Sequence, residues 1–305
     1  MEAQSNILVS GFTYVMNAEL LDFPVVESIL SVLPICDEFV VACGRSQDNT
    51  RSLIESINSP KIRIIDTVWE PEKFKGGLVH SVQANIALHS CGGDWAIYLQ
   101  ADEVIHERYL PVIKRAIEKY HNDEHVEGFL FSYKHFWGDY EHYQTAHNWY
   151  RREVRVVRNK IGVEVYGDGQ GFRLKGRKLN VILIPAEIYH YGWVRDPRKM
   201  RQKIIVQDTI HHNADWVDKR HPSETRELPF QYGTLKHLAR FTGTHPKVME
   251  ERIKSKNWTV DESVRSSHKH NRLLIRILSF IENRILHTRI GEYRDYKIIG
   301  VDREL

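Results

Sequence analysis

The chain has 305 residues, of which 42% are hydrophobic and 27% are charged, and its formal net charge is +3. This composition is typical of a globular protein with a substantial buried core, and the length suits one large domain or one domain with an elaborated second half. The small net charge and the lack of a basic and aromatic patch of a recognised type argue against nucleic acid as a partner.

The cysteines and the start of the chain favour the cytoplasm. Cys36, Cys43 and Cys91 are odd in number and lack metal-binding spacing, which suits a reducing compartment. No basic start followed by an apolar stretch predicts a secretory signal, and no run of about 18 apolar residues predicts a membrane span. We therefore expect a cytoplasmic protein, with peripheral contact at the inner face of the membrane as an option.

Apolar runs and amphipathic stretches alternate over the first hundred residues. Strands are predicted from Ile7 to Phe12 and over residues 39–43, 62–65 and 95–99, and helices over 22–33, from 48 or 50 to 57, and over 77–90. Continuous apolar strands between amphipathic helices indicate a mostly parallel, doubly wound α/β sheet with helices on both faces. Ligands of such sheets bind beyond the carboxyl ends of the strands, which points to residues 11–19, 44–50 and 100–103.

The second half changes character. Extended segments are predicted over residues 126–133, 154–157, 163–166, 179–184 and 187–191, and Asp196-Pro197 predicts a helix start before a basic stretch. From residue 235 onward the pattern is helical again. We divide the chain into a nucleotide-sugar-binding half (1–105), an acceptor-side half of the same domain (106–234) with a smaller mixed β region, and a helical C-terminal extension (235–305).

Asp102 and Glu103 form the sharpest chemical feature, because they follow an apolar strand directly. A carboxylate at the end of a strand is well placed to hold a hard divalent cation, which would bridge diphosphate oxygens and neutralise a leaving group. The alternative is a solvated loop carboxylate or a helix cap.

Three segments in order resemble the family 2 glycosyltransferases of the GT-A fold. They are Ser10-Gly11-Phe12-Thr13 with Asn17 and Glu19, then Asp37 to Val41 with Ser46-Gln47-Asp48-Asn49-Thr50, then Asn85 with Asp94 to Glu103. The resemblance is close over the first third of the chain and looser to Lys203. Each segment alone is weak, but their order and spacing are fairly specific.

The resemblance implies a role for each matching position. Phe12, Thr13 and Glu19 would line the base and ribose pocket, Asp48 would bond to the base, and Asp102 would bind the metal. The remaining implied donor contacts are Asn17, Ser46, Asn85 and Ala101. The sequence departs from the family pattern at two places. Gln100 stands where the family usually has an acidic residue, which would weaken the metal site. The family also often has an acidic residue near Cys43 and Gly44, and without it the choice of base is left undetermined.

His190 is the second predicted metal ligand, because a late histidine often completes the metal shell in this fold. A site of carboxylate and imidazole suits Mn²⁺ somewhat better than Mg²⁺. The alternative is a histidine packed between Tyr189 and Tyr191 with its ring nitrogens bonded to the backbone.

Asp168 is the predicted general base, since it lies in a glycine-flanked loop where backbone can approach a substrate closely. Glu164, Asp139 and Glu141 compete for this role, and an ordinary turn aspartate is the alternative.

Two further sets of residues could contact the acceptor sugar or a phosphate. The aromatic segment 136–150, with Trp137, could stack on sugar rings, although a core role is favoured. Arg195 and Lys203 could contact a phosphate near the helix that starts at Asp196, or belong to a solvated basic face.

The C-terminal segment carries an apolar stripe at helical spacing with arginines around it, over residues 272–289. Such a helix can lie on an anionic membrane surface, but docking on the domain or on a second subunit is favoured. A homo-oligomer is therefore possible.

The leading hypothesis is an inverting, divalent-metal-dependent glycosyltransferase. It would move a sugar from a nucleoside-diphosphate sugar to an acceptor hydroxyl on a glycan or a lipid-linked saccharide. A glycosyltransferase-like binder without turnover is the alternative that Gln100 keeps open. A sugar nucleotidyltransferase ranks lower, because residues 11–19 carry no lysine or arginine.

Overall fold

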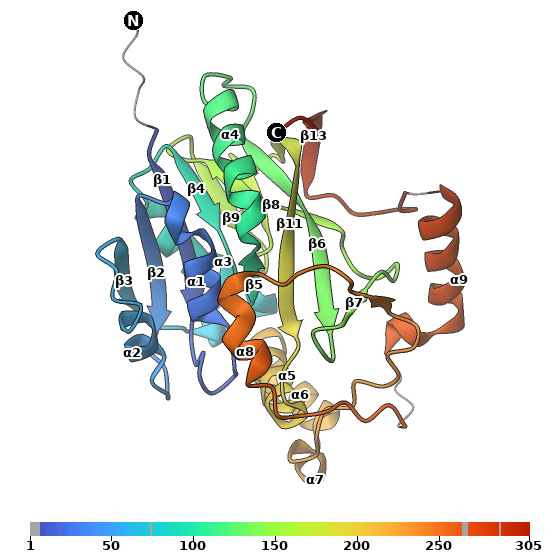
Figure 1. Cartoon of the computed structure of the whole chain (residues 1–305). Helices are drawn as coiled ribbons and strands as arrows, with labels where there is room; N and C mark the ends of the chain where they lie inside the picture. The colour runs from blue at the N-terminus through green and yellow to red at the C-terminus, as the bar shows by residue number, and fades with distance from the viewer. Residues whose placement is uncertain (1–6, 74, 264–267, 287) are drawn as a thin grey trace, which may run out of the picture.

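A sheet of eleven strands joins both halves of the chain in the computed structural model, which describes residues 7–73, 75–263, 268–286 and 288–305 (Figure 1). Its first part is parallel, in the order β4-β1-β2-β3. The bounds are β1 (Val9–Val15), β2 (Glu38–Gly44), β3 (Ile62–Thr67) and β4 (Trp95–Tyr98). All four strands lie where the apolar runs predict them, within one to three residues at their ends.

The second part of the sheet is mixed. Antiparallel β8 joins β4 to β6, and β6 runs parallel to the long strand β11, which also pairs with β5 and β13. The strands are β5 (Glu103–Ile105), β6 (Gly128–Trp137), β7 (His142–Gln144), β8 (Arg152–Arg158), β11 (Leu179–Trp193), β12 (Ala239–Arg240) and β13 (Tyr296–Val301), with β9 (Val163–Tyr166) and β10 (Gly171–Leu174) as a separate hairpin. The predicted α/β fold class with a mixed second region is confirmed.

The single strand β11 covers both of the extended segments predicted over residues 179–184 and 187–191. The two predicted segments are separated by Pro185, which lacks the N–H that a sheet ladder needs. The strand passes this point through an irregularity in its pairing with β6, between Leu183 and Glu187. A bulge of this kind lets a proline lie inside a long strand.

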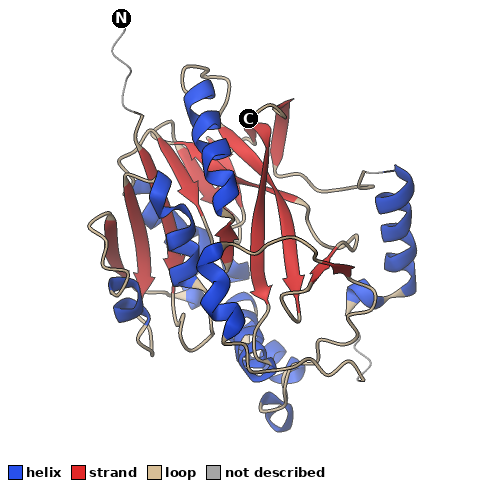
Figure 2. Ribbon diagram, in the orientation of Figure 1, coloured by secondary structure: helices blue, strands red, loops and turns tan. Residues whose placement is uncertain are grey.

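Helices cover both faces of the sheet (Figure 2). They are α1 (Val25–Val32), α2 (Thr50–Glu55), α3 (Leu78–His89), α4 (Leu110–Tyr120), α5 (Pro197–His211), α6 (Ala214–Arg220), α7 (Ser223–Arg226), α8 (Glu250–Lys254) and α9 (Leu273–Ile281). In Figure 1, α1, α4 and α8 lie in front of the sheet, and α5 to α7 gather near the carboxyl ends of the parallel strands. The predicted start of α5 is confirmed, since the Asp196 carboxylate accepts the Arg198 N–H at 2.8 Å.

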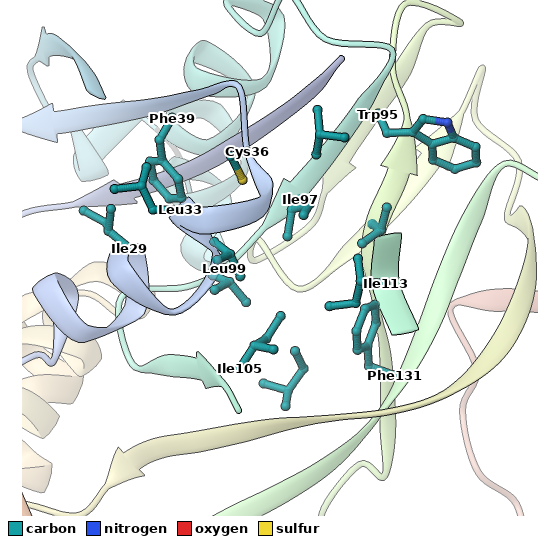
Figure 3. Packing of buried hydrophobic residues seen from close by; sticks show 14 of the residues in the cluster. Ile29, Leu33, Cys36, Phe39, Trp95, Ile97, Leu99, Ile105, Ile113 and Phe131 are labelled. Carbon is teal, nitrogen blue, oxygen red and sulfur yellow. The ribbon is translucent and has the colours of Figure 1, made fainter. Parts of the chain in front are cut away.

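Alternating side chains of the parallel strands form two core clusters, one on each face of this part of the sheet. Phe39 and Val41 of β2 pack with Ile29 of α1 on one face, whereas Val40 and Ala42 pack with α3 on the other. Figure 3 shows the first cluster, where Phe39, Ile97 and Ile113 converge from different elements. Burial on both faces explains why these strands read as continuous apolar runs.

The prediction of renewed helix beyond residue 235 is only partly right. The described residues contain the short α8 and the isolated α9, separated by irregular segments, and β13 then returns to pair with β11. Gly233, Gly243 and Pro246 interrupt any continuous helix there. No helix among the described residues is long and apolar enough to cross a membrane.

The buried carboxyl of Glu153 on β8 should make the stability of the fold depend on pH. Burial raises the pKa of its carboxyl to about 8, and its Oε2 has no hydrogen-bond partner. The unfolded chain therefore ionises this group from about pH 4.3 upward while the folded protein does not, so its contribution destabilises the fold as pH rises towards 8. Between these two pH values, the Glu153 carboxyl lowers the free energy of unfolding by up to roughly 1.4 kcal/mol per pH unit, and Glu153→Gln should abolish this contribution.

The test measures the free energy of unfolding by urea for both proteins from pH 5 to pH 8. The difference between them should grow with pH. Glu164→Gln, which changes an exposed carboxylate of β9, is the control. Parallel pH curves for wild type and Glu153→Gln would contradict the prediction.

Candidate active site

The two loops that follow β1 and β2 bond to each other. They hold four of the predicted donor contacts: Asn17, Glu19, Ser46 and Asp48. The bonds run from Asn17 N–H to Ser46 Oγ (2.9 Å), Gln47 N–H to Asn17 Oδ1 (2.8 Å), Leu20 N–H to Asp48 Oδ2 (2.7 Å) and Asn49 N–H to Glu19 Oε2 (3.2 Å). These side chains therefore set the shape of the loops, and none of them lines the cavity described below.

Phe12, Thr13 and Asn85 also lie away from that cavity. Phe12 and Thr13 are fully buried inside β1, and the Phe12 ring stacks on Tyr98 with centroids 4.9 Å apart. The Asn85 amide donates to Val165 O at 2.9 Å and accepts its N–H at 2.8 Å. Asn85 thus fastens the β9–β10 hairpin to α3.

A small cavity of about 160 Å³ opens at the carboxyl end of β1. The predicted residues Ala101, Asp102 and Asp168 line it, together with residues of α5. We call it the donor-side cavity. Since ligands of such sheets bind at this edge, Ala101 and Asp102 lie at a strand end to which the sequence points, and Asp168 reaches the cavity from the turn between β9 and β10.

Three aromatic residues that the sequence analysis missed form one wall of the donor-side cavity: Tyr14, Trp69 and His80. Tyr14 lies 5.7 Å from each of the other two rings, centroid to centroid. Trp69 Nε1 and His80 Nδ1 are buried without a hydrogen-bond partner. Trp69 lies two residues after β3, which ends at Thr67, so the rule of strand ends could have identified it.

A larger cavity of about 690 Å³ adjoins the first. We call it the acceptor-side cavity. Its walls combine the aromatic rings of Trp149, Tyr150, Trp193 and Phe230 with basic groups that include Lys203. The two cavities share Gln100, Asp102, Gln170, Gln207 and His211, so Asp102 stands at their junction.

Asp102 is buried, with 7% of the residue exposed, and its carboxylate faces the Lys203 ammonium. Lys203 Nζ donates to Asp102 Oδ2 at 3.0 Å and to Gly192 O at 2.7 Å. Burial alone would raise the pKa of Asp102, but the Lys203 ammonium outweighs it and holds this pKa well below its usual range. Burial lowers the pKa of Lys203 to about 8. Asp102 is therefore an anion whose charge is partly balanced by the protein.

The hydrogen bonds of two histidines determine which nitrogen of His190 is free. His135 Nε2 lies 2.8 Å from Tyr150 O, which only accepts, so Nε2 carries the proton of His135. His135 Nδ1 then accepts from His190 Nδ1 at 3.0 Å. Burial lowers the pKa of both rings, so both are neutral. His190 Nε2 is left with a lone pair, 3.7 Å from Asp102 Oδ1.

These two groups form an arrangement that fits a metal cation. A lone pair and a carboxylate oxygen face each other with no proton between them, and the second nitrogen of His190 is held by another ring, as in many metal sites. Gly192 keeps the space open, because an added Cβ would lie 2.4 Å from His190 Nε2 and 2.8 Å from Asp102 Oδ2. Among the residues that the structure describes, no third acidic, histidine or cysteine side chain completes such a group.

Glu103, the other half of the predicted acidic pair, has a structural role. Arg155 Nε and Nη2 donate to its two carboxylate oxygens at 2.7 and 2.9 Å, and both side chains are fully buried. Tyr133 OH donates to Glu103 Oε1 at 2.8 Å. Burial alone would lower the pKa of Arg155, but Glu103 raises it well above its ordinary value. Arg155 is therefore a buried cation bonded to both oxygens of Glu103.

The Glu103–Arg155 pair also positions the loop that carries Asp168. Arg155 Nη1 donates to Gln170 O at 2.9 Å, and Tyr98 OH donates to Gly169 O at 2.8 Å. Asp168 itself is exposed at the tip of the β9–β10 hairpin, on the wall of the donor-side cavity. The chain segments that carry Asp102 and Asp168 are thus joined by one buried framework.

Of the predicted acceptor or phosphate contacts, only Lys203 lines a cavity. Trp137 is buried and stacks on Trp193 with centroids 4.8 Å apart, so Trp193 forms the cavity wall in its place. Arg195 is 1% exposed, and its Nη1 donates to Leu21 O at 2.6 Å. The remaining nitrogens of Arg195, Nε and Nη2, are buried without a partner.

No protein-family model and no curated protein matches the chain. Among solved structures it is similar to S. aureus TarS 1-349 in complex with UDP, at 13% identity over 70% of this chain and 69% of that one, with a TM-score of 0.40. It is also similar to glucosyl-3-phosphoglycerate synthase from Mycobacterium tuberculosis with Mn²⁺, UDP and phosphoglyceric acid, at 17% identity over 43% of this chain and 44% of that one, with a TM-score of 0.30. At such identities and TM-scores, residue roles can come only from the geometry of this chain.

The Glu103–Arg155 pair makes a prediction about stability. Arg155→Met should lower the free energy of unfolding by about 3–5 kcal/mol, because it leaves the Glu103 carboxylate buried without its partner. Arg155→Met combined with Glu103→Leu should lose clearly less, since no unpaired charge remains. Urea unfolding measures both.

Arg51→Met is the matched control, because it breaks an arginine–carboxylate pair with Asp66 in which both side chains are exposed. Its cost should be about 1 kcal/mol or less. Equal losses for Arg155→Met and Arg51→Met would show that the buried pair contributes no more to stability than an exposed one.

Proposed function

We propose that the chain is a glycosyltransferase that moves a sugar from a nucleoside-diphosphate sugar to an acceptor hydroxyl. The observation that carries the proposal is the place of Asp102, between a donor-side and an acceptor-side cavity and beside His190 Nε2 and Lys203. Group transfer needs such a junction, where a leaving phosphate and an attacking hydroxyl reach the same centre. The family resemblance of the sequence points to the same reaction.

The donor nucleotide would bind along the donor-side cavity. Its base would stack on the wall of Tyr14 and Trp69, whose unpartnered Trp69 Nε1 and neighbouring His80 Nδ1 supply hydrogen-bonding groups for it. The diphosphate would then lie near Asp102 and Lys203, and the Lys203 ammonium would stabilise its negative charge. A nucleotide exceeds the present volume of about 160 Å³, so α5, which forms part of this cavity wall, would shift on binding.

A divalent cation would be held by Asp102 Oδ1 and His190 Nε2. The mixed donor set of carboxylate and imidazole suits Mn²⁺ better than Mg²⁺. When bound, such an ion neutralises charge on the departing diphosphate. The protein's own part is to keep His190 neutral with its lone pair towards Asp102, through the His135 hydrogen bond.

The acceptor would bind in the acceptor-side cavity, where Trp149 and Trp193 offer flat apolar faces for a sugar ring. Asp168 would accept the proton of the attacking hydroxyl, giving an inverting displacement. Glu164 is exposed on β9, and Asp139 bonds to His142 at 2.9 Å. Asp168 lines the donor-side cavity, whereas these competitors line neither cavity.

Nucleotide binding and turnover can be separated by substitution at Asp168. In thermal shift assays of the full chain with UDP, GDP, ADP or CDP, we expect one nucleotide to raise the Tm, and more so with Mn²⁺. With the corresponding nucleotide sugars and a panel of saccharide acceptors, Asp168→Asn should keep the Tm shift but lower turnover by about a hundredfold or more.

Glu164→Gln, in the same hairpin, is the control and should keep both properties. If no nucleoside diphosphate raises the Tm, the proposed function is wrong. If Asp168→Asn retains full turnover, another group is the base.

The metal site gives a prediction that does not depend on turnover. His135→Phe should weaken Mn²⁺ binding by about tenfold to a hundredfold, because His190 loses the partner that directs its lone pair. His190→Phe should weaken it further. Free Mn²⁺ in a titration can be counted by electron paramagnetic resonance.

His142→Phe provides the comparison, since His142 bonds to Asp139 and lines neither cavity. Mn²⁺ affinity that is the same in wild type, His135→Phe and His190→Phe would rule out the proposed ligands.

A further inference from the structure

The side of α9 that faces the body of the protein is polar. Ser279 Oγ accepts the His147 N–H at 2.8 Å. Beyond it, Glu282 in the following π-helical turn is fully buried and bonds to His147 Nδ1 at 2.8 Å and to Arg289 Nη1 at 2.7 Å. Asn283 Nδ2 donates to Thr145 O at 3.0 Å. α9 and the turn after it are therefore attached to the domain by hydrogen bonds at Thr145 and His147, while the buried Glu282–Arg289 pair lies within the same segment.

Large apolar side chains of α9 are exposed, and some of them line a groove beside the body of the protein. Leu274 is 79% exposed, Leu273 67% and Phe280 61%, and Ile277 and Ile285 are exposed beside them. Figures 1 and 2 show α9 at the margin of the molecule, apart from the main sheet. A helix of a water-soluble domain normally buries its apolar side, whereas these side chains of α9 stay exposed. The sequence favours docking of this stripe on the domain or on a second subunit, and the described residues of the domain do not cover it.

The charge around this apolar side is entirely positive. Arg272, Arg276 and Arg284 are exposed. Between residues 268 and 290, the only acidic residue that the structure describes is Glu282, which is buried and paired with Arg289. An anionic partner therefore meets no exposed negative charge on α9.

A groove of about 670 Å³ runs between α9 and the strands β7 and β12. Leu238, Ile277 and Phe280 make its apolar walls, and Arg276 and Arg284 also line it. Gln144, which lines the groove and is 5% exposed, has neither of its amide atoms hydrogen-bonded. A groove with apolar walls, basic groups and an unpartnered polar side chain suits an anionic amphiphile better than water.

We propose that α9 binds the surface of an anionic lipid bilayer. Its apolar side chains would enter the boundary of the acyl region, while Arg272, Arg276 and Arg284 would contact lipid phosphates. A second copy of the chain fits less well, because a two-fold contact through α9 would bring the three arginines of each copy together without any exposed acid. This inference does not require the transferase activity.

The membrane contact would lie beside the acceptor side of the cleft. His270 lines the groove and His268 lines the acceptor-side cavity, with their ring centroids 5.4 Å apart. If the proposed function also holds, an acceptor carried by a lipid would reach the cavity from the surface that α9 binds.

Vesicle sedimentation of the full chain tests the proposal. Wild type should sediment with vesicles of phosphatidylcholine that contain about one third phosphatidylglycerol, should not sediment with pure phosphatidylcholine, and should bind less at high salt. Arg276→Glu with Arg284→Glu should lower the partition coefficient at least about tenfold. Leu274→Glu should do the same, because it places a charge in the apolar contact.

Two matched controls make the same chemical changes elsewhere. Lys114→Glu with Arg115→Glu changes two exposed basic residues of α4, and Leu228→Glu changes an exposed leucine far along the chain from α9. Both should bind like wild type. No sedimentation with anionic vesicles, or equal binding by all variants, would overturn the proposal. So would a dimer in light scattering that Leu274→Glu abolishes while vesicles are not bound. Because these outcomes involve no nucleotide, they are independent of the transferase tests.

Discussion

The buried ion pair between Glu103 and Arg155 is the interaction on which the rest of the site depends. It joins the loop after β4, which carries Asp102, to the hairpin that carries Asp168, through hydrogen bonds from one guanidinium to a carboxylate and to the Gln170 carbonyl. Both ions are fully buried, so each relies on the other to offset the loss of water. The backbone next to Asp168 is thereby held beside the cleft.

The surroundings of Asp102 are set by two other groups. The carboxylate has a lysine ammonium on one oxygen and an imidazole lone pair opposite the other. Lys203 comes from α5 and His190 from β11, so two elements distant in the sequence meet a residue at the end of the parallel sheet. The local dielectric is low, and the electrostatic effect of each group on a bound phosphate is correspondingly large.

The sequence predicts the layers of the fold well and the site only in part. Apolar runs locate β1 to β4 because burial on both faces leaves a local signature, and the end of β4 correctly places Asp102 at the cleft. It does not reveal that Asp48 and Ser46 are occupied by neighbouring backbone N–H groups, since those partners are set by the tertiary arrangement. For the same reason the orientation of α9 is invisible: a helical stripe shows which residues share a side, not which way that side faces.

The hairpin tip between β9 and β10 is held by its carbonyl oxygens, at Gly169 and Gln170, rather than by its side chains. Every amino acid carries such an oxygen. Replacing Asp168 or Gln170 would consequently leave the loop in place while altering what it presents to the cleft. This gives natural variation and laboratory selection a position where specificity can be changed separately from folding.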